Sequence, residues 1–276
     1  MGKFTFYKMS GSGNDFILID NREGLLDRDL HEFARKVCHR QLSVGADGLI
    51  LIEPSQVADF KMRIFNADGS EAEMCGNGGR CVARLAHLLG IAREEMTFET
   101  LAGLIRAEVR GSRVKLQMVK PHSLHLNLEV TIHHSPFTVH CINTGVPHAV
   151  LFVEDLEKAP VVELGRKLRY HKAFQPAGTN VNFMKVLGPE ELRIRTYERG
   201  VEDETLACGT GVVASALVAA VLGEAVSPVR VGVRSGEVLT VYFEKRDGEF
   251  KEVFFEGDVR VIYQGELTEE AWSYKI

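Results

Sequence analysis

Two short stretches decide the fold: Met74-Cys75-Gly76-Asn77-Gly78-Gly79-Arg80 and Ala207-Cys208-Gly209-Thr210-Gly211. Each opens an apolar segment rich in Ala, Val and Leu, which ends at Gly90 in the first case and at Gly223 in the second. The two cysteines are separated by 133 residues, and so are the two closing glycines. Because independent features agree on one offset, the sequence indicates an internal duplication.

Two further features follow the same offset. It maps Gly45-Ala46-Asp47 onto Gly178-Thr179-Asn180, and it maps the turn at Gly103 onto the turn at Gly236. Strand-like alternation follows each of these turns. We therefore expect two halves of similar structure.

Each half is predicted to contain several strands and one long helix that begins just after Cys-Gly-x-Gly. Partly alternating apolar residues predict strands at 4–8, 16–20, 48–52, 60–66 and 104–110, and again at 137–142, 149–153, 181–186, 192–197 and 238–244. A shorter helix is expected at 28–38, with Asp27 as its cap. These elements recur at similar places in both halves.

The second long helix gives the strongest indication of the architecture. Between residues 212 and 222 its only polar residue is Ser215, so the helix must be covered on nearly all sides. The predicted fold class is α+β, with two pseudo-symmetric halves, each a mostly antiparallel or mixed sheet wrapped around a central helix. We expect the halves at 1–119, joined by the C-terminal segment 264–276, and at 120–263, with the crossing near 120–124.

Composition excludes several classes of protein. The 276 residues are 45% hydrophobic and 26% charged, which is typical of a globular protein, and no apolar run approaches the roughly 20 residues of a membrane span. The net charge of -5 and the absence of basic runs argue against nucleic-acid binding. The N-terminal residues lack the apolar core of a signal peptide, so we expect a cytoplasmic protein without membrane attachment.

The duplicated cysteines, Cys75 and Cys208, carry the predicted chemistry. At a helix N-terminus, unpaired N–H groups and the helix dipole favour an anion and lower the pKa of a thiol. Two such termini could hold one carboxylate and place a sulfur on each side of the neighbouring carbon. One thiolate would then remove a proton from one face while the other thiol returns a proton to the opposite face. This arrangement predicts racemisation or epimerisation without a metal or another cofactor.

A lone cysteine beside glycines is usually a small buried residue, but two at equivalent positions favour catalysis. The other three cysteines, Cys38, Cys81 and Cys141, lack this setting and are interpreted as core thiols. No C-x-x-C and no closely spaced Cys/His pair occurs, so no metal site is predicted.

Seven motifs in order give the chain a resemblance to the diaminopimelate epimerase family, over nearly its whole length. They lie at residues 10–16 (SGSGNDF), 44–48 (VGADG), 65–70 (FNADGS), 74–78 (MCGNG), 145–148 (GVPH), 178–180 (GTN), and 197–200 (YERG) followed by 207–211 (ACGTG).

The resemblance implies an isomerase of lysine and peptidoglycan precursor synthesis that interconverts LL- and meso-2,6-diaminopimelate. It implies proton transfer by Cys75 and Cys208, and tuning of their pKa values by His148 and Glu198. It further implies that the α-carboxylate is held by Gly76, Asn77, Gly209 and Thr210, and that the distal end of the substrate contacts Asn14, Asn66, Asn180, Glu198 and Arg199. Relatives form homodimers, and the strand around Tyr263 is where we expect the contact.

Two positions depart from the pattern of some relatives, which carry Gln in place of Gly48 and Asn in place of Val146.

Three other functions are compatible with the residues. They are a proline or hydroxyproline racemase or epimerase, a thiol–disulfide oxidoreductase that uses Cys75 and Cys208, and a non-catalytic module that binds an anion. A distal arginine and several asparagines suit diaminopimelate better than a small proline ring, because a distal carboxylate pairs well with a guanidinium.

Overall fold

The computed structural model describes residues 3–246 and 248–275 and divides the chain into two compact units. Unit 1 comprises the chain up to Leu116 and again from Gly257, and unit 2 comprises Gln117–Glu256. The sequence places these divisions after residues 119 and 263. The segment 120–124, expected as the crossing, already contributes to unit 2, where β9 begins at His122.

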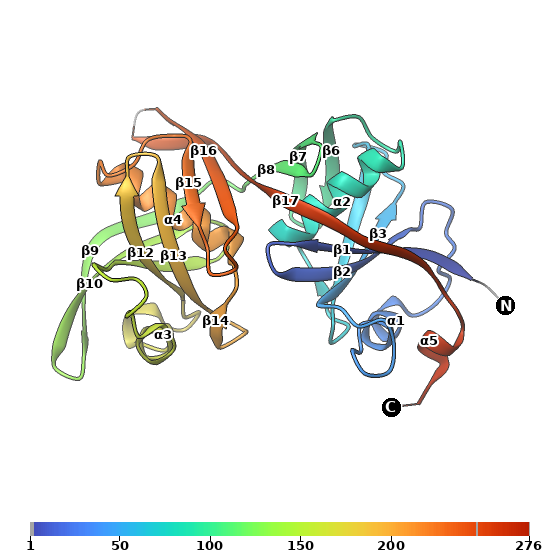
Figure 1. Ribbon diagram of the computed structural model, residues 1–276, viewed down its shortest axis with the longest axis horizontal. Helices are drawn as coiled ribbons and strands as arrows, with labels where there is room; N and C mark the ends of the chain where they lie inside the picture. Colours follow the sequence, from blue (N-terminus) through green and yellow to red (C-terminus); the bar gives the residue numbers. More distant parts are fainter. Residues whose placement is uncertain (1–2, 247, 276) are drawn as a thin grey trace. The chain divides into compact units, whose positions relative to one another are not determined.

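Unit 1 consists of short strands, two helices and a C-terminal helical turn (Figure 1). Its strands are β1 (Phe4–Gly11), β2 (Asn14–Asp20), β3 (Gly48–Glu53), β4 (Phe60–Asn66), β5 (Glu71–Ala72), β6 (Glu95–Thr100), β7 (Gly103–Arg110) and β8 (Arg113–Gln117). Its helices are α1 (Leu30–Val37), α2 (Gly76–Leu88) and the short α5 (Glu270–Ser273).

Unit 2 repeats this plan. Its strands are β9 (His122–Ile132), β10 (Ser135–Asn143), β11 (Pro147–Phe152), β12 (Asn180–Gly188), β13 (Glu191–Glu198), β14 (Asp203–Thr205), β15 (Val229–Gly232) and β16 (Val238–Arg246). Its helices are α3 (Val161–Arg169), the 3-10 turn Lys172–Phe174 and α4 (Gly209–Val221). The last strand, β17 (Glu249–Leu267), pairs with β16 through its first residues and with β1 through its last.

The strand pairing confirms the duplication. The parallel pair β2–β3 aligns Phe16 with Gly48, and the parallel pair β11–β12 aligns Ala149 with Val181, so both members shift by the same 133 residues. An antiparallel strand follows each pair, β4 in unit 1 and β13 in unit 2. The helices α2 and α4 are both 13 residues long and start one residue after Cys75 and Cys208.

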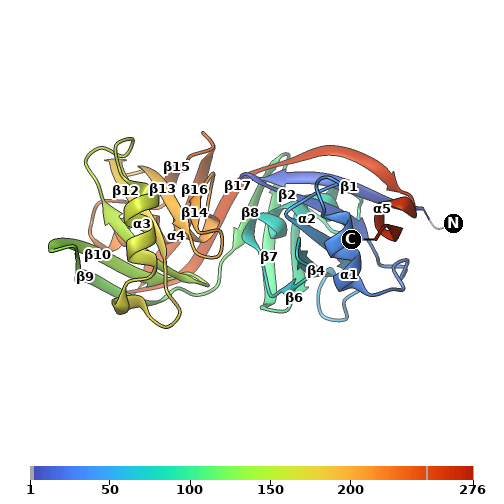
Figure 2. The same cartoon turned by 90° about the horizontal axis from the view of Figure 1, so that it is seen from below.

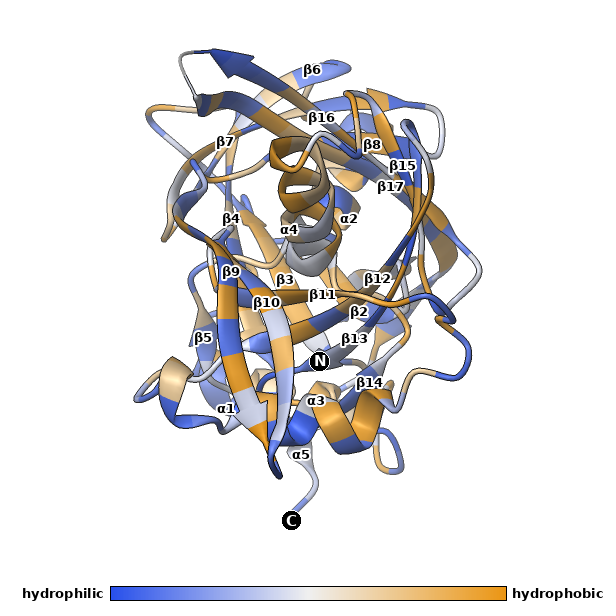
Figure 3. Ribbon diagram, turned by 90° about the vertical axis from the view of Figure 1, so that its left-hand side faces the viewer, coloured by the Kyte–Doolittle hydropathy of each residue, from blue (hydrophilic) through white to orange (hydrophobic). Residues whose placement is uncertain are grey.

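The central helices are enclosed by strands, as the sequence predicts. Helix α4 contacts β10, β11, β12, β13, β15 and β16, and its residues from Gly211 to Ala219 are buried. Figure 3 shows α4 with strands of unit 2 around it. Helix α2 contacts β1, β2, β3, β4 and β7 in the same manner. This burial explains why α4 lacks a polar face.

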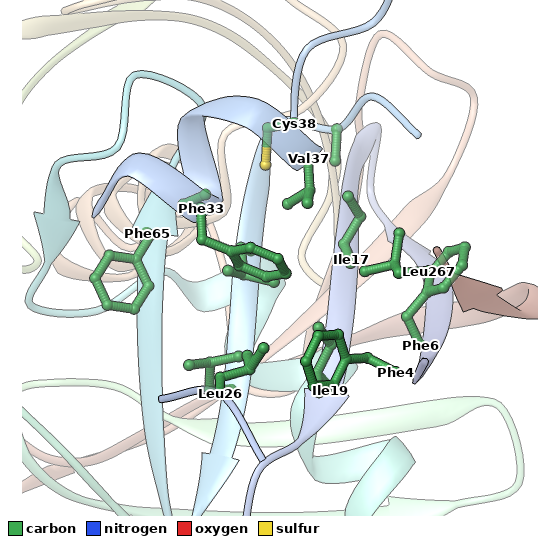
Figure 4. Packing of buried hydrophobic residues seen from close by; sticks show 14 residues of the cluster. Phe4, Phe6, Ile17, Ile19, Leu26, Phe33, Val37, Cys38, Phe65 and Leu267 are labelled. Carbon is green, nitrogen blue, oxygen red and sulfur yellow. The ribbon is translucent and has the colours of Figure 1, made fainter. Parts of the chain in front are cut away.

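A second apolar layer covers the outer face of each sheet. In unit 1, Ile17 and Ile19 belong to one apolar cluster with Phe33 and Val37 of α1 (Figure 4). In unit 2, Val181, Phe183 and Tyr197 pack against Val161 and Leu168 of α3, which lies along β12 and β13 (Figure 2). Strand residues therefore alternate between the central helix and the outer helix.

The first short helix differs from its prediction. It begins at Leu30, and the carboxylate of Asp29, not that of Asp27, accepts hydrogen bonds from the N–H groups of His31 (2.9 Å) and Glu32 (3.3 Å). Both aspartates suit an N-cap, so the sequence pattern could not distinguish them. The predicted helix at 28–38 was two residues too long at its start.

Candidate active site

In unit 1 the candidate residues gather at the start of α2. Cys75 is the N-cap residue in extended conformation, and its Sγ accepts a hydrogen bond from the N–H of Gly78 at 3.4 Å. Gly76 opens the helix, and the side chain of Asn77 in the first turn is buried. The sulfur thus lies among the unpaired N–H groups of the helix, where negative charge is favoured.

A chain of hydrogen bonds fixes Asn77 and Asn14 together. Asn77 Nδ2 donates to Asn14 Oδ1 at 2.8 Å, and Asn14 Nδ2 donates to Asp47 Oδ2 at 2.9 Å. At the other end, Nη2 of the fully buried Arg80 donates to Asn77 Oδ1 at 2.6 Å and to Ser12 Oγ at 2.8 Å. Because Asp47 only accepts and Arg80 only donates, the orientation of both amides is determined. We call Cys75, Asn77, Asn14, Asp47 and Arg80 the α2 cluster.

Charged groups surround the outer end of this cluster. Arg40 Nη2 lies 2.8 Å from Asp47 Oδ1 and 2.6 Å from Asp15 Oδ1, and Lys8 Nζ lies 2.7 Å from Asp15 Oδ2. Burial opposes the charge on Asp15, yet hydrogen bonds from Arg40 and Lys8 hold its pKa at about 2. Asp15 therefore remains a carboxylate in the folded protein.

Asn66 is not joined to the amides of the α2 cluster by a hydrogen bond. It ends β4 opposite Gly48, and its Nδ2 donates to Ser70 Oγ at 2.9 Å within its own turn. A Cβ added to Gly48 would lie 2.7 Å from the carbonyl oxygen of Phe65. The glycine at this position therefore permits a close approach of two strands, and a side chain here would require the backbone to move.

In unit 2 the candidate residues gather at the start of α4. Cys208 is the N-cap residue, and its Sγ lies 3.5 Å from Thr210 Oγ1. The carbonyl oxygen of Thr210 accepts a hydrogen bond from Thr144 Oγ1 at 2.9 Å. Gly209 begins the helix, where an added Cβ would meet the ring of Phe255 at 3.0 Å. The backbone of Cys208 is extended at the N-cap, as is that of Cys75 in unit 1.

Asn180 and Arg199 meet where β12 begins and β13 ends. Asn180 is 3% exposed, and its Nδ2 donates to the carbonyl oxygen of Pro147 at 3.0 Å while its Oδ1 accepts the N–H of Arg199 at 2.8 Å. The guanidinium of Arg199 donates to the carbonyl oxygen of Ala177 at 3.0 Å. Glu198 is the preceding residue, and burial raises the pKa of its carboxyl group.

His148 lies within the same unit and is only 1% exposed. Its Nδ1 is 3.1 Å from Nδ2 of Asn182, a residue to which the sequence motifs assign no role. Burial, together with the positive charge of Arg199, lowers the pKa of His148 to about 3. The imidazole is therefore neutral at physiological pH. We call Cys208, Thr210, Asn180, Arg199 and His148 the α4 cluster.

The remaining cysteines differ from these two. Burial raises the pKa of Cys38 and of Cys81 to about 12, and the pKa of Cys141 to about 11. These thiols stay protonated at neutral pH and are poor nucleophiles. Among residues 3–246 and 248–275, no group of three or more His, Cys, Asp or Glu side chains is arranged to hold a metal ion.

The sequence motifs assign no role to several supporting residues. Asp47 and Arg80 lie beside motif residues, whereas Asn182 and Thr196 lie in the strands predicted at 181–186 and 192–197. A sequence signal exists for Asn182, which is a polar residue between the apolar Val181 and Phe183 of a buried strand. Such residues usually require a specific hydrogen-bond partner.

Comparison with known proteins extends over the whole chain. The family model described as diaminopimelate epimerase matches residues 6–123 and 140–261. Diaminopimelate epimerase of Aquifex aeolicus is 48% identical, with 98% of this chain and 99% of the relative covered. That of Chlorobaculum tepidum is 46% identical, with 94% of this chain and 100% of the relative covered.

No helix within the described part of the chain is long and apolar enough to cross a membrane.

Solved structures of low sequence identity share the fold. A hydroxyproline epimerase from Agrobacterium vitis aligns with a TM-score of 0.69 at 19% identity, over 99% of this chain and 95% of that one. A phenazine biosynthesis protein from Bacillus anthracis aligns with a TM-score of 0.73 at 15% identity, over 97% and 100%. The sequence matches, together with the duplicated helix-capping cysteines, show that the chain belongs to the diaminopimelate epimerase family and is an isomerase.

Proposed function

We propose that the protein interconverts LL- and meso-2,6-diaminopimelate, with Cys75 and Cys208 as its two proton-transfer groups and without a cofactor. One observation carries the proposal: in a chain of this family, each unit places a cysteine at the N-cap of an enclosed helix of 13 residues. The paired caps supply two sulfurs and two sets of N–H donors of the same kind. The pathway would be the synthesis of lysine and peptidoglycan precursors.

The reaction requires a base and an acid on opposite faces of the α-carbon. One cysteine, as thiolate, takes the α-proton, and the electron pair of the broken C–H bond moves into the carboxylate as an enolate. The other cysteine, as thiol, gives its proton to the opposite face and becomes the thiolate. The helix N–H groups stabilise the enolate, because they are already oriented before charge develops. The roles of the two cysteines reverse for the reverse reaction.

The α-carboxylate is proposed to bind at the first turns of α2 and α4, through Gly76, Asn77, Gly209 and Thr210. Asn14, Asn66, Asn180, Glu198 and Arg199 are proposed to contact the distal amino-acid end of the substrate. The bonded pairs Asn14–Asn77 and Asn180–Arg199 support this assignment, since each holds an asparagine amide in a fixed orientation. His148 and Glu198 are proposed to tune the cysteines.

A homodimer is part of the proposal. Val261, Ile262 and Tyr263 of β17 are 38%, 53% and 46% exposed, an unusual run of apolar side chains for a strand facing water. Sedimentation equilibrium of the protein and of a Tyr263→Glu variant tests this point. A monomeric wild-type protein at micromolar concentration would contradict it.

Proton NMR in deuterated water tests the function. Reduced protein is incubated with LL-diaminopimelate, and with L-proline in a parallel sample. We expect loss of the α-proton signal and appearance of the meso isomer with diaminopimelate alone. Exchange with proline alone would show that the substrate is wrong. No exchange in either sample, from folded protein whose Cys75 and Cys208 thiols are free, would contradict the proposed reaction.

A further inference from the structure

The amide of Asn182 has a fixed orientation. Asn182 lies on β12 directly opposite Thr196 on β13, and its Oδ1 accepts a hydrogen bond from Thr196 Oγ1 at 2.9 Å. Its Nδ2 donates to the carbonyl oxygen of Ala149 at 3.2 Å. A carbonyl oxygen can only accept, so the atom that faces Ala149 must be the NH2 group.

This orientation determines the tautomer of His148. The same Nδ2 lies 3.1 Å from His148 Nδ1, and an amide NH2 group cannot accept a hydrogen bond. Nδ1 must therefore present its lone pair to Asn182, which leaves the proton of the neutral ring on Nε2. The neighbouring amide thus makes the outward nitrogen of His148 a hydrogen-bond donor.

Nε2 of His148 is buried and, within the described parts of the chain, has no hydrogen-bond partner. Leaving a buried N–H without an acceptor costs about 1–3 kcal/mol. Native proteins retain few such groups, and a catalytic role is one explanation for those that remain. The nitrogen can therefore donate to an acceptor that arrives with the reaction.

We propose that Asn182 is a positioning residue that holds His148 as an Nε2–H donor to an anionic acceptor, so that His148 does not act as a base. The acceptor is a thiolate or a substrate carboxylate, which share this hydrogen-bonding chemistry. The inference rests on the proposed function for the role of His148, but the tautomer itself follows from the geometry of unit 2 alone.

Two further observations support the proposal. A Cβ added to Gly211 would lie 2.3 Å from Asn182 Oδ1, so the first turn of α4 packs directly against the amide and restricts its rotation. Burial and the positive charge of Arg199 also disfavour the imidazolium form, which would carry protons on both nitrogens. The ring is thus restricted to one neutral form in contact with one amide.

Nitrogen NMR of protein labelled with 15N-histidine tests the tautomer. In the wild-type protein we expect Nε2 of His148 to show the shift of a protonated nitrogen and Nδ1 that of an unprotonated one. In Asn182→Asp the carboxylate can only accept, so Nδ1 should become protonated. Asn127→Asp, the same change at an exposed position of unit 2, should leave the His148 signals unchanged. A wild-type ring protonated at Nδ1 would overturn the proposal.

A second variant protects the test against a folding defect in Asn182→Asp. Asn182→Leu removes the amide while keeping a side chain of similar size in the buried strand, so both tautomers of His148 should become populated. An unchanged single tautomer in folded Asn182→Leu, together with unchanged nitrogen shifts in folded Asn182→Asp, would also overturn the proposal.

Kinetics and ligand binding complete the experiment. For Asn182→Asp we expect kcat to fall by roughly 10²-fold with KM changed by less than about threefold, because the variant impairs proton transfer and not substrate binding.

In the wild-type protein, the proton signal of His148 Nε2–H identifies the acceptor. If the acceptor is sulfur, the signal should shift when thiolate forms on raising the pH. If the acceptor is the carboxylate, the signal should shift only when diaminopimelate is added. A signal indifferent to both would contradict the donor role. Absence of epimerase activity in the wild-type protein with the expected tautomer would instead refute the proposed function.

Discussion

The first turns of α2 and α4 are built on the same backbone but rest on different chemistry. In α2, a Cβ on Gly78 would meet the apolar side chains of Ile50 at 2.9 Å and Ile64 at 3.1 Å. In α4, a Cβ on the equivalent Gly211 would meet the amide oxygen of Asn182 at 2.3 Å. Both units have a cysteine at the N-cap of the central helix. The polar side chains that pack near this cap belong to the helix itself in unit 1 and to the strands in unit 2.

The supporting groups differ accordingly. Arg80 in α2 corresponds to Val213 in α4 under the 133-residue offset, and both side chains are fully buried. Asp15, a carboxylate, corresponds to His148, a neutral imidazole. Equivalent backbone positions can therefore present a charged group in one unit and an uncharged one in the other. Two cysteines in similar caps are consequently expected to have different environments.

The largest effect is expected from removing either cysteine. Cys75→Ala and Cys208→Ala should each lower kcat/KM for diaminopimelate by roughly 10³-fold or more, since each step needs both an acid and a base. The double variant should lose little further activity, because groups that act together are not additive. Epimerisation followed by NMR checks this. A single variant that retains activity within tenfold of wild type would show that the two cysteines are not equally required.

The next largest difference is expected between Gly78 and Gly211, which lie three residues after the two cysteines. Gly78 packs against apolar side chains, and Gly211 packs against the amide of Asn182. Gly211→Ala forces a methyl group against the anchored Asn182 amide, and we expect a loss of stability of about 2–3 kcal/mol from overpacking. Gly78→Ala meets only the flexible ends of Ile50 and Ile64, and the gain of about 1 kcal/mol in helix propensity should offset much of the strain. Thermal unfolding of both variants measures the difference. Equal shifts in Tm would mean that the polar and apolar supports are equally compliant.

Asp15 and His148 should make stability depend on pH in different windows. The pKa of Asp15 is lowered from 3.8 to about 2, so the unfolded state binds its proton first as pH falls, and stability is lost between about pH 4 and pH 2. The pKa of His148 is lowered from 6.5 to about 3. The unfolded state therefore gains that proton first too, and stability is lost as pH falls below 6.5 towards 3.

Denaturant unfolding across this range checks the assignment. His148→Gln should flatten the profile between pH 6.5 and pH 3, and Asp15→Asn should flatten only the lower window. If His148→Gln left the slope around pH 5 unchanged, the histidine would not be buried as a neutral ring.

A smaller effect is expected from Arg80. Arg80→Met keeps an apolar stem in the core but leaves Asn77 Oδ1 without its donor, so Asn77 and Asn14 can reorient. We expect KM to rise by roughly tenfold, the equivalent of about 1.4 kcal/mol, with a smaller change in kcat. Val213→Met is the matched control in α4 and should leave KM within about threefold. An equal rise in both variants would assign the effect to packing alone.

Much of the fold was predictable because its signals are local. The apolar segment after each cysteine and the strict 133-residue offset identified α2 and α4, and the strand predicted at 60–66 matches β4 at both ends. Only the part of β17 around Tyr263 was expected as a strand, whereas the whole strand extends from Glu249 to Leu267. The choice of Asp29 over Asp27 as the cap depends on where the chain enters the helix, which composition does not specify.

The site was predictable only where a motif marks it. Cys75 and Cys208 follow from the duplicated caps, but Asn182 acquires its role from β11 and β13, the strands on either side of it. Its contact with His148 joins residues 34 positions apart through a parallel pairing. The sequence can therefore mark Asn182 as an unusual polar residue of a buried strand, but its partner arises from tertiary structure.

The most direct test of the two-cysteine claim is the distribution of deuterium during early turnover of LL-diaminopimelate in deuterated water. With two bases, the thiol that returns the proton has exchanged with solvent, so the meso product should carry deuterium at the inverted carbon while the remaining LL substrate keeps its hydrogen. Mass spectrometry of the two separated isomers at a few percent conversion gives the answer. Meso product that retains the original hydrogen would mean that a single group both removes and returns it, and would contradict the account.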